Sequence, residues 1–240
     1  MYYMSLLSTA LRDFPQLISY GRFVEIEPRL TGPLAVYLMS CFGEVTGVSY
    51  VDSTALKVCG NKRISRNRVF ADQAKIGKTT MGWFFGFKLH IVISHRGELL
   101  GIRITPGNCD DRSPVPGMCQ DIVGKTFGDK GYISQSLTEN LMEHGLRLVT
   151  GLRKNMREQL LPLIDKLLLR KRSIIETVIG QLKQTLHIDH TRHRSPANFL
   201  VNLLAGLVAY SHKPHKPSIL LSPEEYQHLT ALESGQMLIA

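Results

Sequence analysis

The chain has 240 residues, 43% of them hydrophobic, which is enough to bury a substantial core in one large domain with appendages. Its longest apolar run near the C-terminus, residues 199–210, is too short to span a bilayer, and its first residues lack the features of a signal peptide, so we expect a soluble intracellular protein. Basic side chains (29) outnumber acidic ones (20), giving a net charge of +9 that favours nucleic acid as partner, and four scattered cysteines without a C-x-x-C pair argue against a zinc knuckle or a disulfide framework.

The first part of the chain changes character at about residue 44. Residues 1–43 are predicted to be helical but irregular, interrupted by prolines such as Pro28 and Pro33 and without an obvious core of their own. The β-branched and aromatic run VTGVSYVD then predicts a strand that ends on Asp52. The basic, glycine-dotted segment 57–81 predicts an exposed loop.

The middle of the chain predicts strands. Two strands over 83–94 and 99–105 are joined by HRGE in a hairpin, and a short helix follows over 115–123. The run KTFGDKGY predicts a brief strand with Asp129 at its end.

The second half alternates helices and strands. Ser134 is expected to cap a helix that stops at Gly145, and a strand over 147–151 leads to a long helix that includes residues 169–183. The order βββαβαβα predicts an α/β fold with a mixed sheet of about five strands flanked by helices.

The helix over 169–183 presents a carboxylate between two cations. At 100° per residue, Glu176, Arg172, Lys183 and Leu169 share one face, next to an apolar stripe that would hold it against a core. The plainer alternative is a solvated helix face with an intrahelical Arg172/Glu176 pair.

Three acids occupy positions where α/β sheets present their sites. Asp52 and Asp129 end strands, and Glu176 lies on the last of these helices. Converging carboxylates attract two Mg²⁺ ions, which together activate a water or a 3′-hydroxyl in phosphodiester displacement. Arg172 and Lys183 would then grip the phosphate backbone beside the metals.

Four ordered motifs resemble one family. VDST around Asp52, GFKLH with ITPGNCDDR, GDKGY around Asp129 and the R-x3-E-x6-K pattern around Glu176 are similar to bacterial insertion-sequence transposases of the DDE type, most of all to insertion-sequence family nine-eight-two, over residues 14–220. The resemblance implies the RNase H-like fold, with the three acids as ligands of two Mg²⁺ ions for which Mn²⁺ substitutes. It also implies terminal inverted repeats and target DNA as partners, a homo-oligomer, and a bacterial cytoplasmic, nucleoid-associated protein without membrane contact.

The resemblance also implies a division of the chain. Residues 1–43 would be the remnant of a truncated helical N-terminal region, 44–212 the catalytic domain and 213–240 a tail unlike the family. Two alternatives stay open: a truncated, catalytically inactive DNA-binding remnant, and a general RNase H-like nuclease. In the pattern that some relatives share, a tyrosine stands where this chain has Leu169.

Further basic residues are candidates for DNA contact, with solvated surface as the alternative. They are Lys130, Arg63, Arg66, Arg68, Arg192 and Arg194. Trp83, the single tryptophan, is expected in the core rather than stacked on an unpaired base. Of the acidic pair Asp110 and Asp111, a turn or capping role is favoured over a place near the site.

Overall fold

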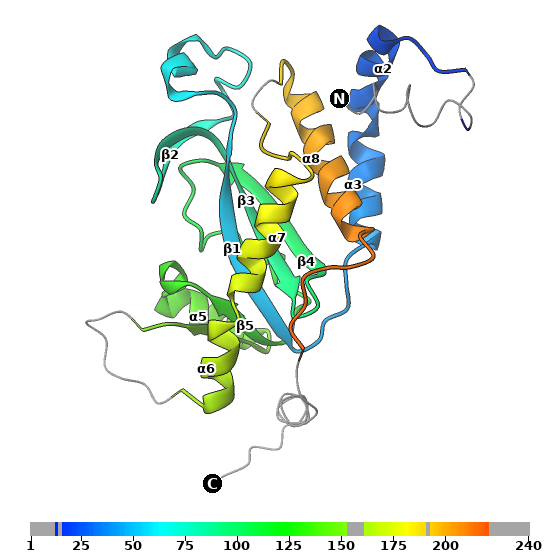
Figure 1. The fold of residues 1–240 in the computed structure, drawn as a ribbon. Helices are drawn as coiled ribbons and strands as arrows, with labels where there is room; N and C mark the ends of the chain where they lie inside the picture. Colours follow the sequence, from blue (N-terminus) through cyan, green and yellow to red (C-terminus); the bar gives the residue numbers. More distant parts are fainter. Residues whose placement is uncertain (1–12, 14–15, 153–160, 191–192, 221–240) are drawn as a thin grey trace.

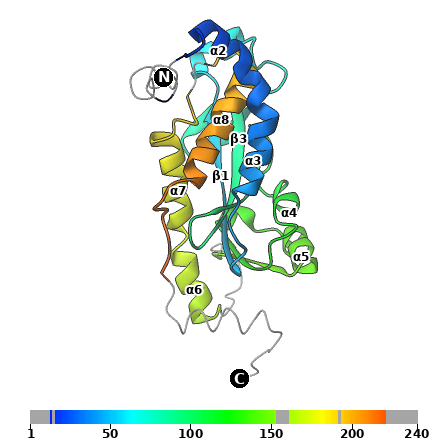
Figure 2. The same ribbon diagram turned by 90° about the vertical axis from the view of Figure 1, so that its right-hand side faces the viewer.

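The computed structural model describes residues 13, 16–152, 161–190 and 193–220. Its centre is a six-stranded mixed sheet with helices on both faces, seen from two directions in Figures 1 and 2. The strands are β1 (Val48–Lys57), β2 (Lys75–Thr79), β3 (Gly82–Ser94), β4 (Leu99–Pro106), β5 (Gly124–Gly128) and β6 (Leu146–Thr150). The α-helices are α2 (Tyr20–Ile26), α3 (Thr31–Ser40), α4 (Val115–Met118), α5 (Gln135–Glu143), α6 (Leu163–Arg170), α7 (Ser173–Gln184) and α8 (Pro196–Ser211). Three 3₁₀ segments are η1 (Glu27–Leu30), η2 (Asn61–Arg66) and η3 (Lys130–Tyr132).

The sheet has the strand order β4, β3, β1, β5, β6. β1 and β4 each pair antiparallel with β3, whereas β5 runs parallel to both β1 and β6. Three antiparallel strands followed by two parallel strands added through helical connections form the RNase H-like topology, which confirms the predicted fold class. The sixth strand, β2, pairs with the first residues of β3 and was not predicted.

Alternate residues of β1 face two separate hydrophobic cores, as the two-residue period of a strand requires. Tyr50 is buried in the larger core, which includes Ile175 of α7 and Leu207 of α8. Val51 is buried in the smaller core, together with Leu137 of α5. Figure 2 shows the corresponding layers, with α7 and α8 on one side of the sheet and α4 and α5 on the other.

The segment before the sheet is more regular than its prolines suggest. The predicted interruption is present at Pro28, which lies in the 3₁₀ segment η1 between α2 and α3. It is wrong for Pro33, which lies in the first turn of α3, where a missing backbone N–H breaks no hydrogen bond. α3 packs along α8 and buries Leu38 in the larger core.

The prediction of an exposed loop over residues 57–81 is also wrong. The segment contains η2 and β2, and β2 is an edge strand with mostly exposed residues, so it lacks the hydrophobic period that marks a buried strand. Gly77 lets β2 lie directly on a neighbouring loop, since a Cβ at this position would be 2.0 Å from the carbonyl oxygen of Gly107.

Several of the remaining elements follow the predictions. The hairpin between β3 and β4, the strand β6 and helix α5 are present, and the Ser134 side chain accepts a hydrogen bond from the backbone N–H of Leu137. The helix expected over 115–123 ends at Met118, directly after Gly117, a poor helix former. Within the described residues, no helix combines the length and the apolar character needed to cross a bilayer.

Candidate active site

Asp52 lies in the middle of the central strand β1, not at its end. Its carboxylate is 22% exposed and accepts a hydrogen bond of 2.8 Å from the backbone N–H of Ser53. The backbone that carries this carboxylate is paired with β3, where Asp52 lies opposite Ile91, while the pairing of β1 with β5 ends at Tyr50. The strand predicted to stop at Asp52 continues to Lys57, paired with the first half of β3.

Asp129 follows the last residue of β5 and begins η3. Its carboxylate accepts a hydrogen bond of 2.7 Å from the backbone N–H of Gly131. Tyr50 pairs with Phe127 in the parallel ladder between β1 and β5, and each acid follows this last pair by two residues, Asp52 within β1 and Asp129 just after β5. The charge of Asp129 contributes to the raised pKa of Asp52, which indicates that the two carboxylates are near each other.

Arg172 connects the carboxylate of β1 to that of α7. One of its nitrogens lies 3.3 Å from Asp52 Oδ2 and the other 2.8 Å from Glu176 Oε1. The predicted Arg172/Glu176 pair is therefore present, but Arg172 also makes a tertiary contact that an isolated helix face would not have.

The single helix predicted over 169–183 is wrong. It is divided between α6, which contains Leu169, and α7, which begins at Ser173, with Lys171 and Arg172 in the turn between them. No glycine or proline marks this break in the sequence. The Arg172 guanidinium next to the break binds Asp52 in the sheet, a contact between distant parts of the chain that helical periodicity cannot reveal.

The pKa of Asp52 is raised by burial and further by its two acidic neighbours. Burial raises the pKa of its carboxyl to about 6; the Ser53 N–H and the Arg172 charge oppose the rise, and the charges of Asp129 and Glu176 add to it. Within the described part of the chain no three His, Cys, Asp or Glu side chains are arranged as a metal site. The donor chemistry nevertheless fits a hard divalent cation, because three carboxylates offer only oxygen ligands and their mutual repulsion would be relieved by positive charge.

Two lysines of this region, Lys183 and Lys130, have different surroundings. Lys183 Nζ donates a hydrogen bond of 2.9 Å to the carbonyl oxygen of Ala55, and burial lowers its pKa. Lys183 thereby fastens α7 to β1. Lys130 is exposed in η3, directly after Asp129.

A polar cluster beside Asp52 was not predicted. Asp111 Oδ1 accepts hydrogen bonds from Ser53 Oγ at 2.7 Å and from Lys88 Nζ at 3.0 Å, and the buried ring of His90 lies 4.0 Å away. Asp111 therefore lies near the candidate site, whereas Asp110 has the turn role expected for the pair, accepting hydrogen bonds from the backbone and side chain of Arg112. The only sequence signal for the cluster is the acidic pair itself, because β3 and the loop after β4 supply the partners.

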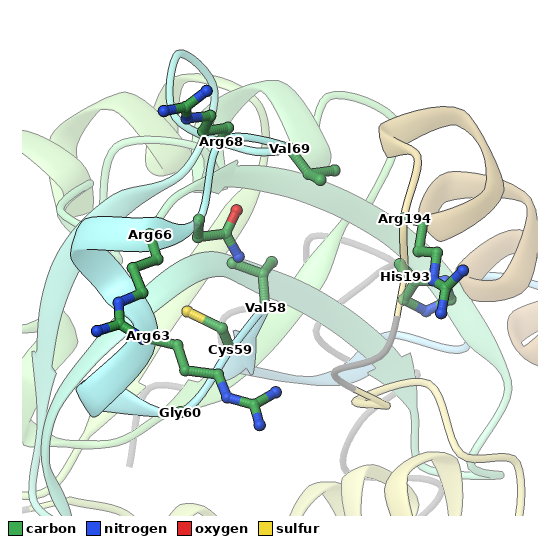
Figure 3. A pocket seen from close by; sticks show the side chains of 10 residues that line it. Val58, Cys59, Gly60, Arg63, Arg66, Arg68, Val69, His193 and Arg194 are labelled. Carbon is green, nitrogen blue, oxygen red and sulfur yellow. The ribbon is translucent and has the colours of Figure 1, made fainter.

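Four of the basic residues predicted to contact DNA line one hollow. Figure 3 shows Arg63 and Arg66 on the η2 side and Arg194, from the segment before α8, on the opposite side. Arg68 also lines the hollow, which has a volume of about 720 Å³. All four arginines are exposed, and no carboxylate of the described residues forms an ion pair with them. Arg192 lies outside the described residues.

The prediction that Trp83 packs in the core is wrong. Trp83 is 60% exposed at the start of β3, and the ammonium of Lys78 lies 5.5 Å from its ring centroid. Trp83 pairs in register with Lys78 of the edge strand β2, whose residues are mostly exposed, and this position at the edge of the sheet explains the exposure. All four cysteines are free.

Comparisons with known proteins give one family and several structures. Residues 42–196 match the family model described as a transposase DDE domain. A search of curated proteins gives no match. A piggyBac transposase in a synaptic complex with hairpin DNA has 13% identity and a TM-score of 0.48, covering 88% of this chain and 58% of that chain, so this chain spans less than two thirds of that protein.

Two structures of the Mos1 transposase are also similar. Its mariner catalytic domain has 9% identity and a TM-score of 0.27, covering 91% of this chain and 96% of that chain. Its paired-end complex with the left transposon end has 11% identity and a TM-score of 0.28, covering 95% of this chain and 70% of that chain.

Proposed function

The chain belongs to the transposase DDE domain family, and on this premise we propose that it is a DNA transposase that catalyses metal-dependent phosphodiester hydrolysis and strand transfer at the ends of an insertion sequence. The proposed element belongs to the bacterial insertion-sequence family nine-eight-two, which the motif pattern of the sequence supports. The DNA partners are the element's terminal inverted repeats and its target, and the chain acts as a homo-oligomer in the bacterial cytoplasm, at the nucleoid.

The observation that carries this proposal is the bridge formed by Arg172. It joins Asp52 on β1 to Glu176 on α7, and the charge of Asp129, just after β5, acts on the carboxyl of Asp52. These contacts support the proposal that the three acids, from distant parts of the sequence, form one site.

In the proposed reaction Asp52, Asp129 and Glu176 hold two Mg²⁺ ions, for which Mn²⁺ substitutes. Bound there, the ions would lower the pKa of an attacking water or 3′-hydroxyl and neutralise charge on the leaving oxygen. Asp52 supplies the more rigid ligand because it lies within β1, paired with β3, and its side chain is only 22% exposed, whereas the Glu176 side chain is 57% exposed. The Arg172 guanidinium is placed to exchange a carboxylate for a phosphate oxygen when DNA binds.

The arginine hollow, formed by Arg63, Arg66, Arg68 and Arg194, is proposed to bind a part of the DNA backbone that is distant from the cleavage site. Four exposed guanidinium groups that form no ion pair with a carboxylate of the described residues suit phosphate, which arginine binds in a bidentate manner. The hollow begins at Val58, directly after β1, about 20 Å along the extended chain from Asp52. Lys130 and Lys183 would add positive charge nearer to the carboxylates, and Arg192 is proposed as a further contact.

The test is cleavage of DNA that carries the repeats flanking the gene, in Mg²⁺ or Mn²⁺, with the full chain and Glu176→Gln. We expect cuts at the repeat ends with the unchanged chain and at least about a hundredfold lower rate with the variant, because removing one ligand of a catalytic cation removes several kcal/mol of transition-state stabilisation. Asp72→Asn, at an exposed loop acid, is the matched control and should cut normally.

Two results would contradict the proposal. Cleavage that ignores the repeats would indicate a general nuclease of the same fold. Binding of DNA without cleavage in either metal would indicate a protein that only binds DNA.

A further inference from the structure

A second hollow lies between the exposed tryptophan and the candidate active site. It has a volume of about 460 Å³. Its walls come from the β2–β3 hairpin and from the loop after β4, and include Trp83, Lys78, Asn108 and Asp111. Nothing in the reaction proposed above uses the hairpin side of this hollow.

The hollow adjoins the carboxylates through two short connections. Gly131, which lines it, donates its backbone N–H to Asp129 at 2.7 Å. Asp111, which also lines it, accepts a hydrogen bond from Ser53, the residue after Asp52. A group bound in this hollow would therefore lie next to the carboxylates of the proposed active site.

Trp83 is held in place although it is exposed. Asn61 of η2 donates a hydrogen bond of 3.0 Å to its carbonyl oxygen, and the Lys78 ammonium lies over its ring. An indole that is 60% exposed, on a backbone anchored by Asn61, offers an apolar stacking face.

The charges and polar groups in the hollow suit a nucleotide rather than an apolar segment of a protein. The carboxylates of Asp110 and Asp111 are each paired with a cation, Arg112 and Lys88, so they do not leave a net negative wall. The Lys78 ammonium supplies a positive charge that suits a phosphate. The Asn108 side-chain amide can donate a hydrogen bond to the edge of a base and accept one from it.

We propose that this hollow binds one unpaired nucleobase of the DNA strand beside the scissile phosphate, stacked on Trp83. The inference rests on the proposed function, and it adds that the site prefers DNA whose end is single-stranded or unwound. Stacking on an aromatic side chain is tolerant of sequence and needs a base that has left the duplex.

The single tryptophan makes a direct test possible, because all indole fluorescence of the chain comes from Trp83. The full chain is titrated in EDTA, so that no cutting occurs, with a single-stranded oligonucleotide, a blunt duplex and a duplex with a single-stranded overhang. We expect strong quenching by the first and third DNA and at least threefold weaker quenching at saturation by the blunt duplex.

Variants separate stacking from general DNA affinity. Trp83→Ala should weaken binding of the single strand about tenfold and leave the blunt duplex unchanged, while Trp83→Phe should retain most of the affinity. Met81→Ala is the matched control, because Met81 is 89% exposed on the same hairpin and does not line the hollow.

Each outcome decides between the inference and its premise. DNA binding without quenching, or equal quenching by blunt duplex and single strand, overturns the base-binding site and leaves the proposed function intact. Quenching by unpaired DNA without metal-dependent cutting supports the hollow and overturns the proposed chemistry. If Trp83→Ala abolishes self-association in sedimentation and leaves single-strand affinity unchanged, the surface contacts a second protein copy and the inference is wrong.

Discussion

The Arg172 guanidinium lies 3.3 Å from the carboxylate of Asp52. This contact joins the turn before α7 to the central strand of the sheet, and the same guanidinium also binds Glu176 at 2.8 Å. It partly offsets the burial and the two acidic neighbours that raise the pKa of Asp52 to about 6. Without a bound cation, these neighbouring carboxylates make the folded chain less stable than it would be with fewer charges at the site. Several consequences are measurable.

Asp52→Asn should stabilise the chain in EDTA at pH 7.5. The folded pKa of Asp52 lies above the unfolded value of 3.8, so the carboxyl lowers the free energy of unfolding increasingly from pH 4 to 6 and by a constant amount above it. The shift corresponds to about 2–3 kcal/mol at most, since the side chain is 22% exposed. Urea unfolding of both proteins from pH 4 to 8 measures the difference, which should vanish near pH 4.

Mg²⁺ should make the unchanged chain more stable than Asp52→Asn. Saturating Mg²⁺ is expected to raise the Tm of the unchanged chain and to leave Asp52→Asn nearly unaffected, because a cation that binds only the folded state stabilises it. A higher Tm in both proteins would mean that the cation binds elsewhere.

Stability should fall in mild acid because of His90. Burial lowers its pKa to about 4, and the charge of Lys88 adds to this while that of Asp111 opposes it. The unfolded chain takes up a proton near pH 6.5 and the folded one does not until about pH 4, so the free energy of unfolding falls as pH drops through this window. His90→Asn should remove about 2–3 kcal/mol of this pH dependence in urea titrations. An unchanged slope would contradict the assignment.

The buried pair Lys125 and Asp165 should be sensitive to the loss of either partner. The two side chains are 7% and 0% exposed and lie 2.6 Å apart, joining β5 to α6. Asp165→Ala is expected to lower the free energy of unfolding by about 3–5 kcal/mol, since it leaves a buried ammonium unpaired. The double variant Lys125→Met, Asp165→Leu should recover most of this loss in the same denaturation assay. A double variant no more stable than the single one would show that the charges themselves are required.

Removing arginines from the hollow should change how DNA binding depends on salt. Each of Arg63→Ala, Arg66→Ala and Arg194→Ala should reduce the slope of log K against log salt concentration by about one, because each phosphate contact releases about one counterion. Fluorescence anisotropy with labelled duplex at several salt concentrations measures this slope. Arg22→Ala, at an exposed residue paired with Glu25 on α2, is the control and should leave the slope unchanged.

The sequence contained enough information for the sheet and its acids but not for their surroundings. β1, β3, β4, β5 and β6 were predictable because hydrophobic and β-branched runs alternate with turn residues. The edge strand β2 was not, because its exposed residues carry no such period. The break at Arg172 depends on Asp52, a partner distant in the chain, and the exposure of Trp83 depends on its place opposite the edge strand β2, which was not predicted.

The central claim is that Asp52, Asp129 and Glu176 hold the divalent cations, and Mn²⁺ is the probe that tests it most directly. Crystals of the full chain grown with Mn²⁺ would be measured for anomalous scattering, which locates the ion without reference to activity. The account predicts manganese about 2.0–2.4 Å from oxygens of these carboxylates, with the Arg172 guanidinium moved away from at least one of them. Manganese bound only at other side chains, with Arg172 still bridging Asp52 and Glu176, would contradict it.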